Sequence, residues 1–372
     1  MTLDLTLLLI PPLACAHAAF WGILISNLAY LRRHRPPSLE SYPSLSVCIP
    51  ARNEAQNLRR LLPTLQSQDY PDLEVIVWDD GSEDGTSNLL ASIDDPRISS
   101  FRGEGPPQDW VGKVHALYQC TRRASGEYYL FLDADAELLC PDALRTLMDR
   151  HVNSSTRVSS GFPHLKGSAL LLVSLVPHAL LQSLPWFLVA RTQTSSLSAL
   201  NGQCWLVDQA LYHNHEPHAE VNGEILEDVA IGRYLKAQGY PPSLLDVQDV
   251  VAVHMYDSFG AAWRGFRKNA YLLLGGTVPQ FAFMYGGFVL TWLVAPLLSA
   301  WFLASLYGFK IVTDRASGMP VYVTLLAPVS YLLGLALQLD SALHHWTGQV
   351  TWKGRSVHTS SLAPASTTDG ES

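Results

Sequence analysis

Charged residues are scarce in this chain, and three long stretches have almost none. Only 16% of the 372 residues are Asp, Glu, Lys or Arg, and the mean hydropathy of +0.11 is high for a soluble enzyme. Residues 3–31 contain one charged side chain, Asp4, and residues 271–309 and 319–339 contain none. Because about 20 apolar residues cross the hydrocarbon core of a bilayer, these stretches predict membrane spans. The alternative for the two C-terminal stretches is a helix buried in a large soluble domain.

The first apolar stretch lacks the features of a cleaved signal peptide. No basic residue precedes it, its apolar run is too long, and no small-x-small cleavage motif follows it. We therefore expect residues 1–31 to form an uncleaved transmembrane anchor. Arg32, Arg33 and Arg35 follow directly. By the positive-inside rule they predict that the chain from residue 32 onward is cytoplasmic.

An excess of basic residues and a pattern of paired cysteines are also missing. Lys and Arg number 25 against 33 Asp and Glu, a formal net charge of −8, whereas nucleic-acid binders normally carry a basic footprint. Nucleic acid is therefore excluded as a partner. Neither a disulfide framework nor a zinc site is predicted, because the cysteines form no CxxC pair and are odd in number. They are Cys15, Cys48, Cys120, Cys140 and Cys204.

The region after the first arginines alternates short apolar runs with helical patterns, which indicates βαβ units and a mostly parallel sheet. The predicted strands are residues 45–49, 73–78, 98–101 and 128–132, and the predicted helices are residues 54–66, 86–93 and 113–124. Ligands of such sheets bind beyond the carboxyl ends of the strands. Here those ends carry carboxylates and other polar residues.

Two carboxylates follow the last of these strands. Asp133 and Asp135 flank Ala134 directly after the apolar run. At a strand end they can together hold a divalent cation that bridges a diphosphate, and hard oxygen ligands suit Mg²⁺ or Mn²⁺. An Asp-x-Asp triplet also arises by chance on solvated loops, but its place after a buried strand favours a metal site.

Polar residues follow the first two strands as well. Residues 79–86, Asp-Asp-Gly-Ser-Glu-Asp-Gly-Thr, end the second strand and begin a helix. A turn with an N-cap explains one or two of them, but not paired carboxylates at the ligand-binding edge. Residues 50–54, Pro-Ala-Arg-Asn-Glu, lie at the same edge, where backbone N–H groups at a helix start can meet an anion.

Four motifs together resemble the family-2 inverting glycosyltransferases. IPARNE, WDDGSEDGT, Gly112-Lys113 and FLDADAE occur in the family's order over residues 45–140. The resemblance implies an α/β GT-A fold, the Rossmann-like nucleotide-diphospho-sugar transferase fold, over residues 45–270, and a nucleotide-sugar donor. It assigns donor binding to Ala51, Glu54, Asp80, Lys113 and Asp133, and the metal, Mg²⁺ or Mn²⁺, to Asp133 and Asp135.

The family's catalytic base is the aspartate of a Glu-Asp pair, which Glu227-Asp228 in GEILEDVAIG matches. Leu226 stands where the family commonly has Thr. An inverting transfer needs one base to take the proton of the acceptor hydroxyl as it attacks the anomeric carbon. The diphosphate leaving group needs only charge stabilisation. The alternative for this pair is a solvated helix start.

Residues 263–269, Trp-Arg-Gly-Phe-Arg-Lys-Asn, resemble a variant of the family's Q/RxxRW region without the leading Gln and the trailing Trp. The resemblance assigns Arg264 and Arg267 to the acceptor or diphosphate, together with Gln203 and Glu227. It also implies that residues 201–203, Asn-Gly-Gln, shape the acceptor pocket. The alternative for the arginines is a juxtamembrane basic patch attracted to anionic lipid.

Residues 168–190 are apolar but contain His178, Gln182 and two prolines. Asp133 and Asp228 must share one site, so the chain cannot cross the membrane between them. We therefore expect an amphipathic segment at the membrane interface, where polar side chains cost little.

We further expect a linker at residues 32–44, a C-terminal transmembrane region of about two spans at residues 271–340, and a cytoplasmic, partly disordered tail at residues 341–372. One span is expected within residues 280–309 and one within 319–340, with Gly318 on the far side of the membrane. A re-entrant turn near Pro279 or Gly286-Gly287 is the alternative.

A narrower likeness concerns the acceptor. DWVGKVHAL, FRKNAY and VTWKGRSV resemble the carotenoid- and hopanoid-associated branch of the family. This likeness implies transfer of a hexose, glucose from a UDP-sugar, onto a carotenoid-like lipid by a multi-pass protein of the cell (inner) membrane. Two alternatives stay open: a polyprenyl-phosphate or polysaccharide glycosyltransferase, and a non-catalytic membrane scaffold. The intact carboxylates argue against the scaffold.

Overall fold

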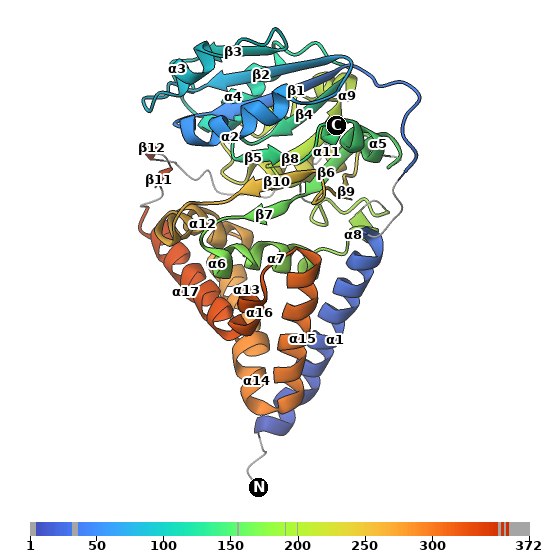
Figure 1. The fold of residues 1–372 in the computed structure, drawn as a ribbon. Coiled ribbons are helices and arrows are strands. Elements are labelled where there is room, and N and C mark those ends of the chain that lie inside the picture. The colour runs from blue at the N-terminus through green and yellow to red at the C-terminus, as the bar shows by residue number, and fades with distance from the viewer. Residues whose placement is uncertain are drawn as a thin grey trace, which may run out of the picture.

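The computed structural model describes residues 5–31, 36–154, 156–189, 191–198, 200–348, 351–352 and 355–356. It shows an α/β part standing on a group of helices that narrows towards the N-terminus (Figure 1). Arg32, Arg33 and Arg35, on which the predicted orientation rests, lie outside the described residues, and so does the tail beyond residue 356.

The main sheet has seven strands in the order β3-β2-β1-β4-β8-β6-β9. Strand β8 runs antiparallel to β4 and β6, and the other neighbours are parallel. The strands are β1 (Leu45–Ala51), β2 (Leu73–Asp79), β3 (Ile98–Arg102), β4 (Tyr128–Leu132), β6 (Val158–Phe162), β8 (Cys204–Asp208) and β9 (Ser243–Asp246). The predicted α/β fold with a largely parallel sheet is confirmed.

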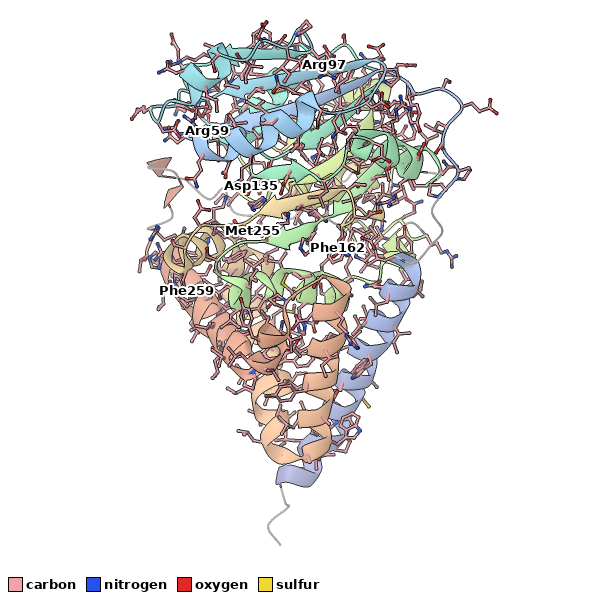
Figure 2. The ribbon with its side chains drawn as sticks, viewed as in Figure 1. Arg59, Arg97, Asp135, Phe162, Met255 and Phe259 are labelled. Carbon is pink, nitrogen blue, oxygen red and sulfur yellow. The ribbon has the colours of Figure 1, made fainter. Side chains whose placement is uncertain are left out.

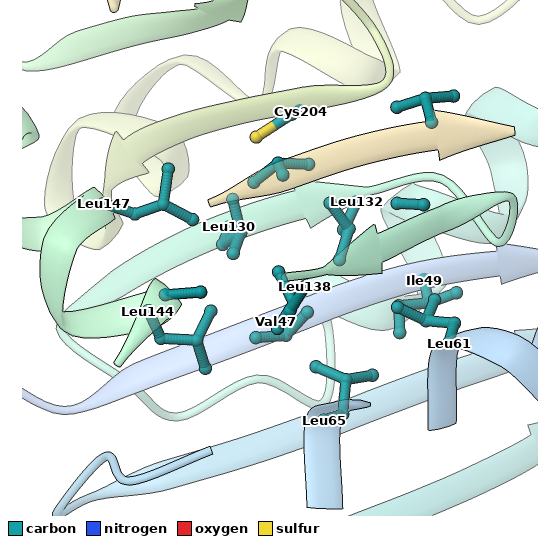
Figure 3. Packing of buried hydrophobic residues seen from close by; sticks show 14 of the residues in the cluster. Val47, Ile49, Leu61, Leu65, Leu130, Leu132, Leu138, Leu144, Leu147 and Cys204 are labelled. Atoms are coloured by element: carbon teal, nitrogen blue, oxygen red, sulfur yellow. The ribbon is translucent and has the colours of Figure 1, made fainter. Parts of the chain in front are cut away.

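Helices cover both faces of this sheet because its strands alternate between two apolar cores. In β1, Val47 and Ile49 join the core beneath α2, and Cys48 between them joins the core beneath α4. Helix α2 presents leucines 58, 61, 62 and 65 at helical spacing to the first core, as Figure 3 shows for Leu61 and Leu65. The helices around the sheet are α2 (Ala55–Gln66), α3 (Thr86–Ala91), α4 (Gly112–Thr121), α5 (Ala143–Val152), α9 (Gln209–His215), α10 (Pro217–Glu220) and α11 (Glu227–Ala237).

A second, three-stranded sheet lies between the main sheet and the lower helices (Figure 1). Its order is β5 (Ala136–Leu138), β10 (Val251–His254) and β7 (His164–Lys166), with β10 antiparallel to β5 and parallel to β7. Strand β5 begins directly after Asp135, so this sheet continues the chain from the predicted metal motif towards the helices.

Two helical stretches among the described residues are long and apolar enough to cross a membrane, Leu8–Leu31 and Val278–Leu298. Only 17% and 22% of their most apolar windows are buried, which is compatible with helices that face lipid. The first lies in α1 (Leu5–Leu31), and the second comprises α13 (Val278–Val289), the π-helix η1 (Leu290–Val294) and α14 (Ala295–Leu298). They stand side by side with α15 (Ala300–Ala316), while α16 (Val321–Leu325) and α17 (Ala327–Trp346) complete the group.

The chain turns back earlier than predicted. Ser299 has an extended backbone that ends α14, and its hydroxyl accepts the Trp301 N–H at the start of α15. Helix α15 then returns to the sheets, where Gly318 lies so close to His164 of β7 that an added Cβ would be 2.8 Å from the ring. The expected position of Gly318 on the far side is therefore wrong. The alternative turn sites are helical: Pro279 lies in the first turn of α13 and Gly286-Gly287 within it.

Residues 168–189 contain three short helices beneath the second sheet, α6 (Leu170–Val173), α7 (Leu175–Ser183) and α8 (Trp186–Val189). His178 and Gln182 are buried in the protein, so protein groups surround them, and the position of this segment at the membrane interface remains a prediction. The His178 ring hydrogen-bonds the Tyr331 hydroxyl at 3.1 Å and the Thr313 hydroxyl at 3.4 Å. These partners replace the water that a polar group loses on burial.

The hairpin at Ser299 generates a topological prediction. Reporter fusions after residues 160, 200 and 318 should all report the side of the sheets, and a fusion after Ser299 should report the opposite side. Each fusion point is tested with two reporters, one active only on each side of the membrane, and their activities show on which side the fusion point lies. The same side for the fusions at 299 and 318 would mean that the hairpin does not cross the bilayer.

Candidate active site

The predicted donor and metal residues lie at one edge of the main sheet because β1, β2 and β4 are parallel and end there. The Asp80 N–H donates to the Ala51 carbonyl at 2.8 Å, and the Asp133 N–H donates to the Gln203 carbonyl at 3.1 Å. In Figure 2, Asp135, Met255 and Phe259 follow one another from the sheets down to the helices. The metal motif therefore lies at the boundary between the α/β part and the helical part.

Lys113, at the start of α4, is the central group of the site. Its ammonium lies 2.8 Å and 2.9 Å from the two oxygens of Asp133 and 3.0 Å from Glu227 Oε1. It also approaches the Gly202 carbonyl at 3.4 Å. Although burial opposes its charge, Asp133 and Glu227 raise the pKa of Lys113 above its usual value. One lysine thus joins four segments that are far apart in the sequence.

Asp228 lies beside this cluster in the first turn of α11. Its two oxygens accept the backbone N–H groups of Gly202, at 3.1 Å, and of Val229, at 2.8 Å. Burial, helped by the neighbouring charge of Glu227, raises the pKa of Asp228 to about 6. A carboxyl group with such a pKa is mostly ionised at neutral pH and can still take up a proton, which is what a general base requires.

Gly202 lies in the segment Asn201-Gly202-Gln203, which the resemblance assigns to the acceptor pocket. A Cβ at this position would lie 3.1 Å from the Asp228 Cβ and 3.3 Å from Glu227 Oε1, so a larger residue would displace these side chains by a few tenths of an ångström. Its loop is held by Asn201, whose N–H donates to the Ser160 hydroxyl at 2.8 Å.

Asp133 and Asp135 fit a divalent cation. Burial raises the pKa of both, and burial with the charges of Asp133 and Glu54 brings that of Asp135 to about 8. Asp135 Oδ1 is buried without a hydrogen-bond partner in the described part of the chain. The described part of the chain contains no group of three or more His, Cys, Asp or Glu side chains spaced to hold a metal. A cation here would take its other ligands from donor phosphates and water, as Mg²⁺ commonly does.

Side chains of the loop after β2 accept hydrogen bonds from backbone N–H groups at the start of α2. The Asn53 N–H donates to the Ser82 hydroxyl and the Glu54 N–H to the Thr86 hydroxyl, both at 2.9 Å. The Ala55 N–H donates to Asp84 Oδ2 at 3.1 Å. The expectation that backbone N–H groups here meet an anion is therefore wrong, because side chains of the next loop already bind them. The roles predicted for Ala51, Glu54 and Asp80 in donor binding remain predictions.

On the acceptor side, α12 (Phe259–Leu273) carries a third basic residue of interest, Lys268, besides the two predicted arginines. Arg264 is exposed, and the Arg267 guanidinium lies 3.6 Å from Asp340 Oδ2 of α17. Lys268 instead lies in the electrostatic field of Glu227 and Asp228, and burial lowers its pKa. The roles predicted for both arginines remain predictions, and Lys268 joins them as a candidate.

Tyr256 lies between the metal motif and α12 and was missed. Its backbone has a φ of 57°, in the left-handed region that disfavours large side chains, and a Cβ at Gly265 would be only 2.2 Å from its hydroxyl. Burial and the charges of Asp135 and Asp133 raise its pKa. No motif signals this residue, because it reaches the site through the path of the chain from β10 to α12.

Comparison with known proteins agrees with this geometry. Residues 46–215 match the model of Glycosyl transferase family 2. They form a family-2 glycosyltransferase domain. The resemblance predicted from the motifs is thereby confirmed, and the protein is an enzyme of this class. The match ends before Glu227 and Asp228, so their roles stay predictions.

Two relatives extend the likeness beyond that domain. The chain is 24% identical over 366 residues to a 4,4′-diaponeurosporenoate glycosyltransferase of Staphylococcus haemolyticus, with 90% of this chain and 94% of the relative covered. It is 26% identical over 289 residues to the protein of the same name from Staphylococcus aureus, with 74% and 72% covered.

A solved structure with a similar fold is the mannosyltransferase PcManGT from Pyrobaculum calidifontis, determined in complex with GDP-Man and Mn²⁺. The TM-score is 0.55 at 19% sequence identity, and the likeness covers 90% of this chain and 97% of that one. The GT-A fold is thereby confirmed.

The close approach of Gly202 to Asp228 generates a prediction. Gly202→Ala should lower kcat, by less than the roughly 10²-fold that a misplacement of about 1 Å costs, because the new Cβ displaces the Asp228 side chain by only a few tenths of an ångström. Gly286→Ala is the matched control, since nothing lies within 4 Å of a Cβ there. Steady-state kinetics with circular dichroism would make the comparison. Equal rates for the two variants would show that the position of Asp228 does not depend on Gly202.

Proposed function

We propose that the protein transfers a hexose, glucose from a UDP-sugar, with inversion onto a carotenoid-like lipid at a membrane. The observation that carries the proposal is the meeting of the Asp133 carboxylate and the Glu227-Asp228 pair around Lys113, directly above helices with exposed apolar surface. A donor diphosphate at Asp133 and an acceptor at Asp228 would then be close enough to react.

Different residues of this chain carry out different parts of the proposed transfer. Asp228, held by two backbone N–H groups, takes the proton of the acceptor hydroxyl while the acceptor oxygen bonds to the anomeric carbon and the bond to the diphosphate breaks. A divalent cation at Asp133 and Asp135 would stabilise the charge of the leaving diphosphate. Lys113 and Lys268 supply positive charge on the same side.

The names of the relatives support the acceptor. Both are diaponeurosporenoate glycosyltransferases, and the likeness to one covers nine tenths of this chain. A lipid acceptor also fits the position of the site, because the second sheet and α12 connect the metal motif to the apolar helices. The donor, the cell-membrane location and the cytoplasmic orientation belong to this proposal and rest on the sequence resemblance and the predicted charge bias.

Purified protein in lipid nanodiscs, supplied with UDP-glucose and a carotenoid acid, tests the proposal by mass spectrometry of the lipid extract. A hexose adduct should form, disappear with EDTA and return with Mn²⁺ or Mg²⁺. Asp135→Ala should abolish it, and Asp69→Ala, which removes an exposed surface carboxylate, should not. Full activity in EDTA would contradict the metal site, and no adduct with any lipid acceptor would contradict the function.

The pKa of Asp228 sets a pH dependence. With a hydroxyl acceptor, kcat should fall as pH drops through about 6, because protonated Asp228 cannot act as a base. Asp228→Asn should lower kcat by about 10²–10⁴-fold without loss of UDP-sugar binding. With a carboxylate acceptor, which is ionised above about pH 4, both effects should be much smaller. A variant that keeps half the wild-type kcat on a hydroxyl acceptor would place the base elsewhere.

A further inference from the structure

The contacts of Lys113 place a monovalent cation where the proposed divalent cation would bind. Its ammonium lies 2.8 Å and 2.9 Å from the two oxygens of Asp133, so it covers both ends of the carboxylate. Glu227 and the Gly202 carbonyl complete its surroundings. An ammonium has three N–H donors, and these acceptors are enough to use all of them.

We infer that Lys113 and a divalent cation compete for the carboxylate of Asp133, and that the diphosphate of the donor relieves this competition by giving Lys113 an anionic partner. The inference rests on the metal use in the proposed function. It makes Lys113 the residue that couples cation binding to donor binding.

The competition follows from distances and charge. Mg²⁺ binds carboxylate oxygens at about 2.0–2.1 Å. A cation so close to either oxygen of Asp133 would lie near the ammonium that contacts both oxygens, and the two positive charges would repel each other in a site where burial weakens screening. The repulsion therefore favours movement of Lys113 away from Asp133 when the cation binds there.

Lys113 keeps two hydrogen-bond acceptors when it moves away from Asp133. Glu227 Oε1, at 3.0 Å, and the Gly202 carbonyl, at 3.4 Å, remain as partners after the contacts with Asp133 are lost. With only these two partners, Lys113 has fewer acceptors than before. Leaving Asp133 therefore costs free energy until a diphosphate binds and supplies new acceptor oxygens. Diphosphate oxygens are strong acceptors for an ammonium.

The consequence is a coupling that works in both directions. A cation alone binds weakly, because it must displace Lys113, and a nucleoside diphosphate alone binds weakly, because Lys113 stays on Asp133. Together each strengthens the other by the same factor, as linkage requires. Loss of the donor after transfer would return Lys113 to Asp133 and help to release the cation.

Mn²⁺ binding to the full-length, detergent-solubilised protein tests this inference. The free Mn²⁺ signal in electron paramagnetic resonance gives the affinity with and without UDP. Lys113→Met should bind Mn²⁺ alone more tightly than the wild type, by about 5–150-fold, the usual range of a coupling between sites. The gain in Mn²⁺ affinity on adding UDP should be smaller in the variant than in the wild type.

Lys268→Met is the matched control, because it removes the same charge from the field of the same carboxylates. It should raise Mn²⁺ affinity much less than Lys113→Met, and an equal increase would reduce the effect to general electrostatics and overturn the inference. Lys113→Gln, which keeps a donor for Glu227 and Gly202 without the charge, should behave as Lys113→Met and guards against a folding defect.

The other outcomes are also decisive. Weaker or unchanged Mn²⁺ binding in both Lys113 variants would make the lysine a structural support only, and would overturn the inference while leaving the proposed function intact. No saturable Mn²⁺ binding in the wild type and in all three variants, with or without UDP, would contradict the metal use in the proposed function and the inference with it.

Discussion

Burying several carboxylates in one place costs free energy, because each loses the water that stabilises its charge. In this enzyme Asp133 and Glu227 share the ammonium of Lys113, at 2.8 Å and 3.0 Å. That shared contact joins the strand end that carries the predicted metal ligands to the helix that begins with the predicted base. Gly202 adds a carbonyl for the lysine and an N–H for Asp228, so a single loop positions both halves of the site.

The second sheet determines how this site relates to the helices below it. Strand β5 begins directly after Asp135, and the His254 N–H of β10 donates to the Asp135 carbonyl at 2.9 Å. From β10 the chain passes through Tyr256 into α12, which packs along α17. The metal motif is thus hydrogen-bonded to the end of β10, and α12 begins only a few residues further along the chain. The proposed lipid acceptor rests on this continuity.

Hydropathy identified the apolar stretches but not how the chain passes through them. The run without charge at residues 271–309 contains the first arm of a hairpin and the beginning of the second, and the break falls at Ser299, a residue that also occurs within helices. A count of apolar residues cannot detect such a break. The partners of His178 could not be predicted for a related reason: Thr313 and Tyr331 come from a part of the chain more than 130 residues away, and no local pattern reveals them.

The sequence by itself determined the strands that begin at Leu45, Leu73 and Tyr128, because apolar periodicity and strand-end carboxylates are local properties. The first two continue to Ala51 and Asp79, one or two residues beyond the predicted ends. The sequence also determined the family, because four short motifs in a fixed order are specific. Only the tertiary structure decided that Lys113 lies between Asp133 and Glu227, and that α12 turns Lys268 towards the carboxylates while Arg267 lies beside Asp340. The physical reason is that these pairings depend on how helices far apart in the sequence rotate and pack against each other, and a linear pattern does not encode that rotation.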